Sequence, residues 1–236
     1  MTSTKANLIY LPGLEGTGKL LFTQADLYAD YNVFEIAYPQ DREVSYEDLA
    51  DLAAKPLQQA GPGIVLAESF GGGVALTLAL RYPELVERMI LVNTFAYFLR
   101  RPVIELLSWV AGPLPDRPSH PATRKIREMF FFSPDVPSST RDEWWKLAGT
   151  VPMSAMGRRI VLIRDLDLRA RLANISIPSL VLTANDDRIV APAAGKDIAK
   201  RLPRAKLLEK RVAHAALVHP EVNVAEWLAE KQYWQY

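Results

Sequence analysis

The chain has 236 residues, 49% of them hydrophobic, and its 28 lysines and arginines against 27 aspartates and glutamates leave a formal net charge of +1. A chain of this length can bury a globular core unaided, and the absence of cysteine excludes a disulfide framework, a thiolate nucleophile and every cysteine-ligated metal site. Because the charges nearly cancel and no block of like charge occurs, we expect a small-molecule partner and no nucleic acid.

The first apolar run follows a short polar start and continues for only five residues before the first glycine. This is too short for the core of a signal peptide or for a membrane span. We therefore expect a cytoplasmic protein with no membrane-spanning segment. No feature of the sequence specifies an oligomeric state.

Short apolar runs bounded by glycine, proline or asparagine recur along the chain. Their hydrophobicity is continuous, which is typical of strands buried on both faces of a parallel sheet. The expected strands lie at 7–13, 33–38, 63–68, 89–93 and 180–184. Segments with helical spacing lie at 17–28, 45–59, 70–82, 193–202 and 220–231. This alternation predicts an α/β fold with a doubly wound, mostly parallel sheet and right-handed crossovers.

The alternation breaks between about residues 95 and 174. This stretch has no convincing strand, but it contains short amphipathic segments separated by prolines and rich in aromatic side chains. We expect residues 95–174 to form a helical cap, inserted after strand 89–93. Residues 1–94 and 175–236 would then form the core domain.

Ser69 lies between the expected strand 63–68 and a helix that opens with glycines. A serine on such a tight strand-to-helix turn is typical of a nucleophile elbow, with its hydroxyl exposed above the sheet. Ala67 and Gly71 are small, as the close approach of strand and helix requires, although the usual first glycine is replaced by Ala67. A serine before a glycine-rich stretch is also a common helix N-cap, so Ser69 alone leaves both interpretations open.

Candidate partners for Ser69 follow later in the chain. A nucleophilic serine needs a base, and the base needs a carboxylate that orients it and stabilises the imidazolium. Strand 180–184 is followed by Asn-Asp-Asp, which supplies Asp186 and Asp187, and the segment AHAALVHP supplies His214 and His219.

Three segments together resemble the α/β-hydrolase superfamily: PGLEG after the first strand, AESFG at the elbow, and NDDRIV followed by AHAALVHP. The resemblance covers essentially the whole chain and implies the α/β-hydrolase fold, with serine, acid and histidine in this order. It implies Asp187 as the acid and His214 as the base. Asp186, which could instead form a turn, remains the alternative acid. His219 precedes Pro220 and is interpreted as a surface residue at the start of a helix.

The same resemblance implies an oxyanion hole made of two backbone N–H groups. One belongs to Phe70, which follows the nucleophile, and the other belongs by position to Leu14 in the loop after the first strand. The family often has His-Gly where this chain has Pro12-Gly13. That departure changes how the loop is braced and leaves the N–H group in place.

Residues 13–20 also nearly fit the P-loop pattern G-x-x-x-x-G-K-[ST] between a strand and an expected helix. Leu20 stands where the pattern requires the hydroxyl that binds magnesium. A nucleotide-binding protein is therefore a disfavoured alternative. In the hydrolase interpretation, Gly16 and Gly18 let the loop bend over the oxyanion site, and Lys19 is a solvated helix residue.

The expected activity is hydrolysis of a small-molecule carboxylic ester through an acyl-enzyme, in which Ser69 attacks, His214 transfers the proton and Asp187 orients the imidazole. A thioesterase or an acyltransferase on the same fold would use this mechanism too, and both stay open. A noncatalytic binding protein on the same fold is the alternative to an enzyme, although such proteins commonly lack a member of the triad.

Side chains of the expected cap are candidates for an apolar acyl pocket, although they could instead pack against the core. The candidates are Trp144, Trp145, Met153 and Met156. Glu68 is interpreted as a residue that braces the elbow, and His120 as a structural or exposed residue. With three histidines and no cysteine, we expect no metal site, and no cofactor is implied.

Overall fold

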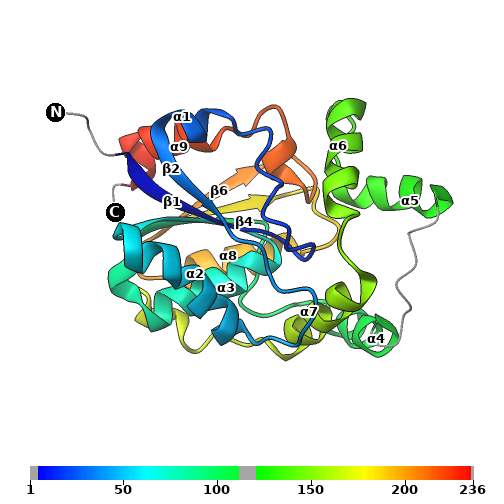
Figure 1. Cartoon of the computed structure of the whole chain (residues 1–236), viewed down its shortest axis with the longest axis horizontal. Helices are drawn as coiled ribbons and strands as arrows, with labels where there is room; N and C mark the ends of the chain where they lie inside the picture. The colour runs from blue at the N-terminus through cyan, green and yellow to red at the C-terminus, as the bar shows by residue number, and fades with distance from the viewer. Residues whose placement is uncertain (1–4, 112–120, 235–236) are drawn as a thin grey trace.

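A computed structural model describes residues 5–111 and 121–234, and within these residues six strands form one sheet. All neighbouring strands are parallel, in the order β2-β1-β3-β4-β5-β6. The strands are β1 Ala6–Leu11, β2 Tyr31–Glu35, β3 Gly63–Glu68, β4 Val86–Val92, β5 Ser179–Ala184 and β6 Ala205–Lys210. The predicted parallel α/β sheet is confirmed (Figure 1).

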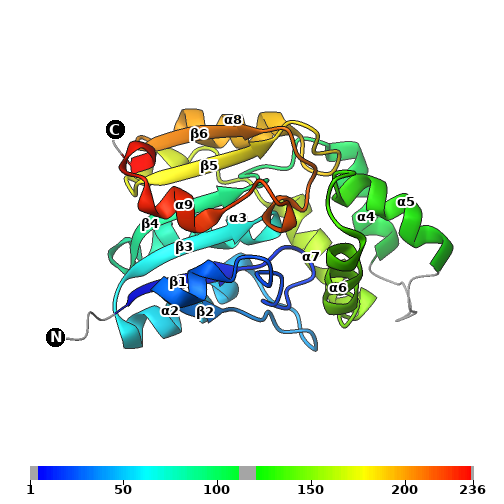
Figure 2. The same cartoon turned by 90° about the horizontal axis from the view of Figure 1, so that it is seen from above.

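Helices cover both faces of the sheet, as Figures 1 and 2 show. One face is covered by α2 Tyr46–Ala60, α3 Phe70–Arg81 and α8 Pro192–Arg201, and the other by α1 Asp26–Asp30 and α9 Val224–Ala229. Alternate strand residues feed two separate cores: Val65 packs with the first group of helices, whereas Leu66 packs with the second. Because both faces are buried, the strands read as continuous apolar runs.

Strand β6 was not predicted, and its charged residues explain why. It forms one edge of the sheet, and all of its side chains are half-buried or exposed. Lys206, Glu209 and Lys210 interrupt any apolar run. β6 therefore lacks the apolar pattern that marked the predicted strands, which include β2 at the opposite edge.

Two predicted helices are shorter than expected. The helix predicted at 17–28 is wrong over most of its length, because only α1 is helical there. Gly16 and Gly18 have positive φ angles, and the Gln24 side chain bonds to Leu217 O and Val222 O of the C-terminal part. The segment is thus a loop tied to a distant part of the chain, so Lys19 is exposed but not helical. Likewise, α9 starts after residue 220.

The capping residues explain the accurate prediction of α2. Ser45 accepts a hydrogen bond from Asp48 N, and the Asp48 side chain accepts one from Ser45 N. This capping box satisfies two backbone donors that would otherwise lack partners. The sequence signal and the structural boundary therefore coincide.

The described part of residues 95–174, namely 95–111 and 121–174, is here called the helical region and lies between β4 and β5 at the carboxyl ends of the strands (Figure 2). The helices there are α4 Arg101–Ala111, α5 Pro121–Phe131, α6 Ser138–Ala148 and α7 Met153–Asp165. Pro137 and Pro152 immediately precede α6 and α7. In the described part of this region the extended pairing is limited to one bridge between Tyr97 and Asp167. His120 lies outside the described residues.

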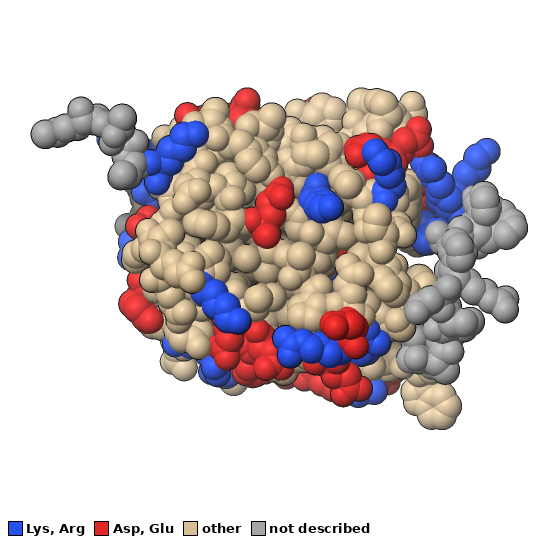
Figure 3. All heavy atoms as spheres, viewed as in Figure 1, with Lys and Arg blue, Asp and Glu red and all other residues tan. Residues whose placement is uncertain are grey.

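Charge is distributed without a dominant sign on the face seen in Figure 3, where basic and acidic side chains are interspersed around a mostly uncharged centre. This agrees with the net charge of +1. Among the described residues, no helix combines the length and apolar character needed to cross a membrane.

Candidate active site

Ser69 sits on a strained turn between β3 and α3. Its φ of 50° lies in the left-handed region, and its side chain makes no N-cap hydrogen bond, so the N-cap interpretation does not apply. A Cβ on Gly71 would lie 2.3 Å from Leu11 O, which explains why α3 must open with glycine. Thr94 Oγ1 donates a 2.5 Å hydrogen bond to Ser69 O and braces the turn from the end of β4. These are the features of a nucleophile elbow.

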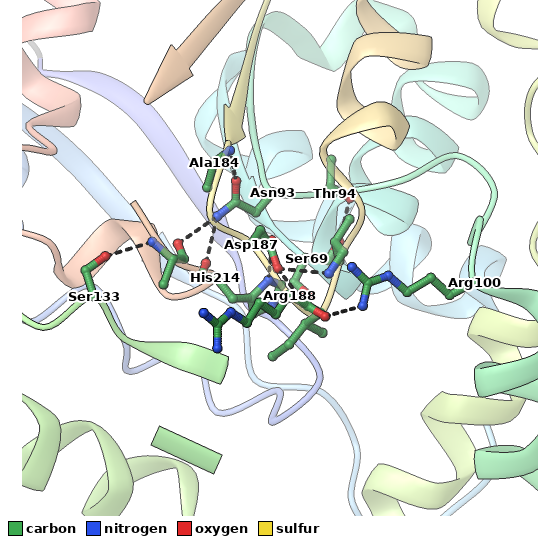
Figure 4. A network of polar contacts seen from close by, with 12 residues as sticks. Ser69, Asn93, Thr94, Arg100, Ser133, Ala184, Asp187, Arg188 and His214 are labelled. Carbon is green, nitrogen blue, oxygen red and sulfur yellow. Dashed lines mark hydrogen bonds and ion pairs between the residues drawn. The ribbon is translucent and has the colours of Figure 1, made fainter. Parts of the chain in front are cut away.

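The structure brings Ser69, His214 and Asp187 together in one chain of hydrogen bonds (Figure 4). His214 Nε2 lies 3.1 Å from Ser69 Oγ, and His214 Nδ1 lies 2.7 Å from Asp187 Oδ2. The second carboxylate oxygen of Asp187 accepts hydrogen bonds from Ile189 N and Val190 N. The acid is thus fixed on both sides.

Asp186 occupies a different environment. Its side chain is 57% exposed and lies 3.9 Å from Arg211 Nε, whereas Asp187 is buried. Of the two candidate acids, the structure therefore places only Asp187 against the imidazole.

The electrostatic environment of His214 suits a proton acceptor. Burial by itself disfavours the charged imidazolium, but the neighbouring Asp187 carboxylate and, to a smaller extent, Glu68 outweigh it and raise the pKa of His214 above its ordinary value. A hydrogen-bonded carboxylate of this kind holds one tautomer of the ring and stabilises the positive charge that forms during proton transfer.

Asn93 joins the end of β5 to the backbone of His214, and the sequence analysis did not single it out. Its Oδ1 accepts a 2.8 Å hydrogen bond from Ala184 N at the end of β5, and its Nδ2 donates a 2.8 Å bond to His214 O (Figure 4). Its φ is 46°, a conformation that asparagine tolerates better than most residues. The available signal was an asparagine directly after a buried strand at the active edge of the sheet.

The loop after β1 lies against the other side of Ser69. A Cβ on Gly13 would lie 3.6 Å from the Ser69 Cβ, so the loop backbone passes next to Ser69. Leu14 is half-buried in this loop. Phe70 is fully buried and stacks on Tyr46 with 5.0 Å between ring centroids. The two predicted oxyanion residues thus flank Ser69 from separate elements.

Two buried acids lie beneath this loop. Burial and the nearby Glu68 raise the pKa of Glu15 to about 8, and burial also raises the pKa of Glu68. Glu68 accepts a hydrogen bond from the Tyr10 hydroxyl on β1, a contact that suits a bracing residue. A buried carboxyl inside the loop and a first helix that begins only at Asp26 are unlike a P-loop, whose backbone N–H groups and adjoining helix N-terminus receive phosphate.

Aromatic side chains of the helical region reach the base through Phe131, which the sequence reasoning missed. The Phe131 ring packs edge-on against His214 with 5.7 Å between centroids. Trp144 and Trp145 pack against Phe131 at 5.2 and 5.7 Å. Met153 is half-buried at the start of α7, as is Met156 one turn later.

The interpretation of His219 as a surface residue is wrong. The side chain is 4% exposed, and its Nε2 lies 2.9 Å from Asp135 Oδ2 in the helical region. Nearby, Ala213 N donates to Ser133 Oγ and Ala215 N donates to Phe131 O, each at 2.8 Å. The loop that carries His214 is therefore covered by the segment between α5 and α6. In residues 5–111 and 121–234, no group of three potential metal-ligating side chains comes together.

The sequence matches the family described as serine aminopeptidase, S33, over residues 36–219. The chain belongs to this family. Together with the fold, this makes it an enzyme of the α/β-hydrolase superfamily. It is 30% identical over 176 residues to the pimeloyl-[acyl-carrier protein] methyl ester esterase of Aromatoleum aromaticum, an alignment that covers 67% of this chain and 69% of that protein.

Solved structures with low sequence identity share the fold. The enol-lactonase from Burkholderia xenovorans LB400 superposes with a TM-score of 0.77 at 19% identity, covering 97% of this chain and 93% of that one. A thermophilic esterase from Thermogutta terrifontis gives a TM-score of 0.80 at 18% identity, covering 99% and 92%. These likenesses support the fold assignment.

Proposed function

We propose that this enzyme hydrolyses carboxylic esters of small molecules through an acyl-enzyme intermediate, with Ser69 as nucleophile, His214 as general base and Asp187 as the orienting acid. The observation that carries the proposal is the continuous chain of hydrogen bonds from Asp187 Oδ2 through the imidazole to Ser69 Oγ. The similarity to a methyl ester esterase supports an ester as the substrate.

In the proposed reaction, Ser69 Oγ attacks the ester carbonyl carbon while His214 Nε2 takes the hydroxyl proton. The carbonyl oxygen becomes an oxyanion, which the N–H groups of Leu14 and Phe70 stabilise. When the intermediate collapses, His214 returns the proton to the departing alcohol, and the acyl group stays on Ser69. Water then attacks the acyl carbon while the same imidazole takes its proton. The bond from the acyl carbon to Ser69 Oγ breaks, the carboxylic acid leaves, and His214 returns the proton to Ser69 Oγ.

We further propose that the helical region acts as a cap that shapes the acyl site. Phe131 lies against the base, and the indoles of Trp144 and Trp145 extend this apolar surface away from it. Met153 and Met156 on α7 are proposed as further lining residues, because their unbranched side chains adapt to substrates of different shape.

A panel of p-nitrophenyl esters from acetate to palmitate, assayed with the parent and with Ser69→Ala, tests the proposal. We expect the parent to hydrolyse part of the panel and Ser69→Ala to lose on the order of a millionfold in kcat. Parallel assays with acyl thioesters and with added alcohol acceptors distinguish a thioesterase and an acyltransferase. A sulfonyl fluoride should label Ser69, as read by mass spectrometry. Activity in Ser69→Ala within tenfold of the parent would refute the proposal.

A further inference from the structure

Arg159 on α7 is among the largest fully buried side chains of the molecule, with only 1% of its surface exposed. Its Nη1 donates hydrogen bonds of 2.8 Å to Leu14 O and to Glu15 O. Its Nη2 donates to Tyr38 O at 3.4 Å and to Pro39 O at 3.1 Å. One guanidinium from the helical region thus holds two segments of the core backbone.

The arginine is used as a hydrogen-bond donor to backbone, since it takes part in none of the ion pairs among the described residues. Burying a guanidinium is costly unless its hydrogen-bonding groups are satisfied. Here both terminal nitrogens of the fork donate to carbonyl oxygens, whereas the buried Nε has no hydrogen-bond partner among the described residues. Cζ lies 5.6 Å from the centre of the Tyr38 ring. The fixed geometry of this fork is something that a lysine does not reproduce.

The loop held by Arg159 is the loop that adjoins the nucleophile. Gly16 has a φ of 64°, and a Cβ there would lie 2.7 Å from Arg159 Cζ. Three residues earlier, Gly13 lies against Ser69. Tyr38 adds a second constraint, because its hydroxyl donates a 3.2 Å hydrogen bond to Pro12 O. The backbone between these two contacts includes Leu14, whose carbonyl is itself bonded to the arginine.

We propose that Arg159 is a positioning residue: from α7 it holds the loop after β1 so that the Leu14 N–H group is placed to stabilise the oxyanion. The inference rests on the proposed function. It assigns to the helical region a part in transition-state stabilisation, in addition to any part in shaping the substrate site. Arg159 itself does not touch the reacting atoms.

The test uses Arg159→Met and Arg159→Lys, with Arg158→Met as the matched control. Arg158 is the neighbouring residue on α7 and bonds to Gln40 O, outside the loop. In an ester assay we expect Arg159→Met to lower kcat by about ten- to a hundredfold, because loss of one oxyanion donor costs about a hundredfold or more. KM should stay within about threefold, and Arg159→Lys should fall between parent and Arg159→Met. Arg158→Met should keep the parent kcat.

A second measurement separates positioning from simple support of the fold. A trifluoromethyl ketone forms a hemiketal with Ser69 whose oxygen occupies the oxyanion site. Its affinity should fall in Arg159→Met by the same factor as kcat/KM, because both depend on the transition-state contacts. If Arg159→Met does not fold, Gly16→Ala tests the position of the loop, since its new methyl group would lie 2.7 Å from Arg159 Cζ and 2.8 Å from Tyr38 Cδ2 and so displaces the loop from both side chains. It should show the same loss of kcat at unchanged KM.

The outcomes are distinct. If the parent's activity depends on Ser69 and Arg159→Met has the same kcat as Arg158→Met, then Arg159 does not have the proposed role. The proposed function still stands in that case. A raised KM at unchanged kcat in Arg159→Met, or a Gly16→Ala variant with parent kcat, overturns the role of Arg159 as well. A parent without Ser69-dependent hydrolysis refutes the proposed function, and this inference falls with it.

Discussion

On one side of Ser69, side-chain hydrogen bonds join His214 to Ser69 at 3.1 Å and to Asp187 at 2.7 Å, and in the proposed reaction these side chains are themselves the reacting or orienting groups. On the other side, the loop after β1 presents backbone, and the side chain that fixes it belongs to Arg159 on α7. In the proposed mechanism, the base side depends on its own residues. The loop side depends on Arg159, which contributes no chemistry of its own.

This difference predicts how a mutation on each side affects kcat. Removing a side chain on the base side removes a participant in the reaction, whereas a substitution beside the loop can only move a backbone group. The helical region contacts both sides, since Asp135 binds His219 close to the base while Arg159 binds the loop. Mutations should therefore separate the two sides by the size of the loss in kcat.

The largest loss on the base side is expected from His214→Ala. Because the serine and the histidine act as a unit, kcat should fall by about as much as in Ser69→Ala, on the order of a millionfold. His219→Ala is the matched control, because it removes a buried histidine that contacts Asp135. It should lower the thermal stability and leave most of the parent kcat. Steady-state kinetics and thermal unfolding check both variants. The reverse order of kcat losses would mean that the base is misplaced.

Asp187→Asn should lower kcat by about ten-thousandfold, because the amide no longer holds the required tautomer. The matched control, Asp186→Asn, changes an exposed carboxylate and should stay within a few-fold of the parent. Equal losses in the two variants would contradict the assignment of the acid.

The dependence of kcat/KM on pH tests whether the Asp187 carboxylate raises the pKa of His214. The base must be neutral to accept a proton, so activity is lost as the pH falls through the raised pKa of His214. Since the charge of Asp187 is a main cause of the increase, the acid limb of kcat/KM should move to lower pH in Asp187→Asn. An unmoved limb would show that the carboxylate does not set this pKa.

A smaller loss, about tenfold, is expected from Asn93→Gly. Glycine keeps the positive φ of 46° but removes the bonds to Ala184 N and His214 O, each of which leaves a buried group unpaired at a cost of about 1–3 kcal/mol. Asn93→Asp keeps the acceptor for Ala184 N but replaces the donor to His214 O with a charged oxygen that repels this carbonyl, so it should lower kcat as well. Kinetics measures the loss of kcat, and unfolding by denaturant measures the loss of stability. Parent kcat in Asn93→Gly would show that this bridge does not position the base.

The residues that meet on the base side were predicted partly from local signals and partly from the resemblance to α/β-hydrolases. Ser69 stands between a buried strand and glycines, whereas the choice of His214 and of Asp187, which lies three residues after a buried strand, came from the resemblance. The structure also explains why Asp187 differs from Asp186: only Asp187 Oδ1 receives the N–H groups of Ile189 and Val190. The geometry of the turn sets these hydrogen bonds. Because both candidates are aspartates, the residue type alone does not distinguish them.

On the loop side, the oxyanion roles of Leu14 and Phe70 remain predictions that rest on their positions in a familiar pattern. Arg159 has no local signature that separates it from other arginines on amphipathic helices. The error at 17–28 has a similar origin. Leu20 and Leu21 give an apolar spacing that resembles a helix, yet Leu20 packs against the helical region and Leu21 packs in the core. Long-range contacts decide both cases.

Strand β6 has a consequence for the behaviour of the molecule in concentrated solution. Its outer edge has no strand partner among the described residues, and Leu207 on it is 40% exposed. Open edges of this kind invite a second copy to add its own strand. With a net charge of only +1, long-range repulsion between copies is weak. The charges of Lys206, Glu209 and Lys210 on β6 therefore provide the local barrier against edge-to-edge association, and replacing them with apolar residues should make the protein aggregate.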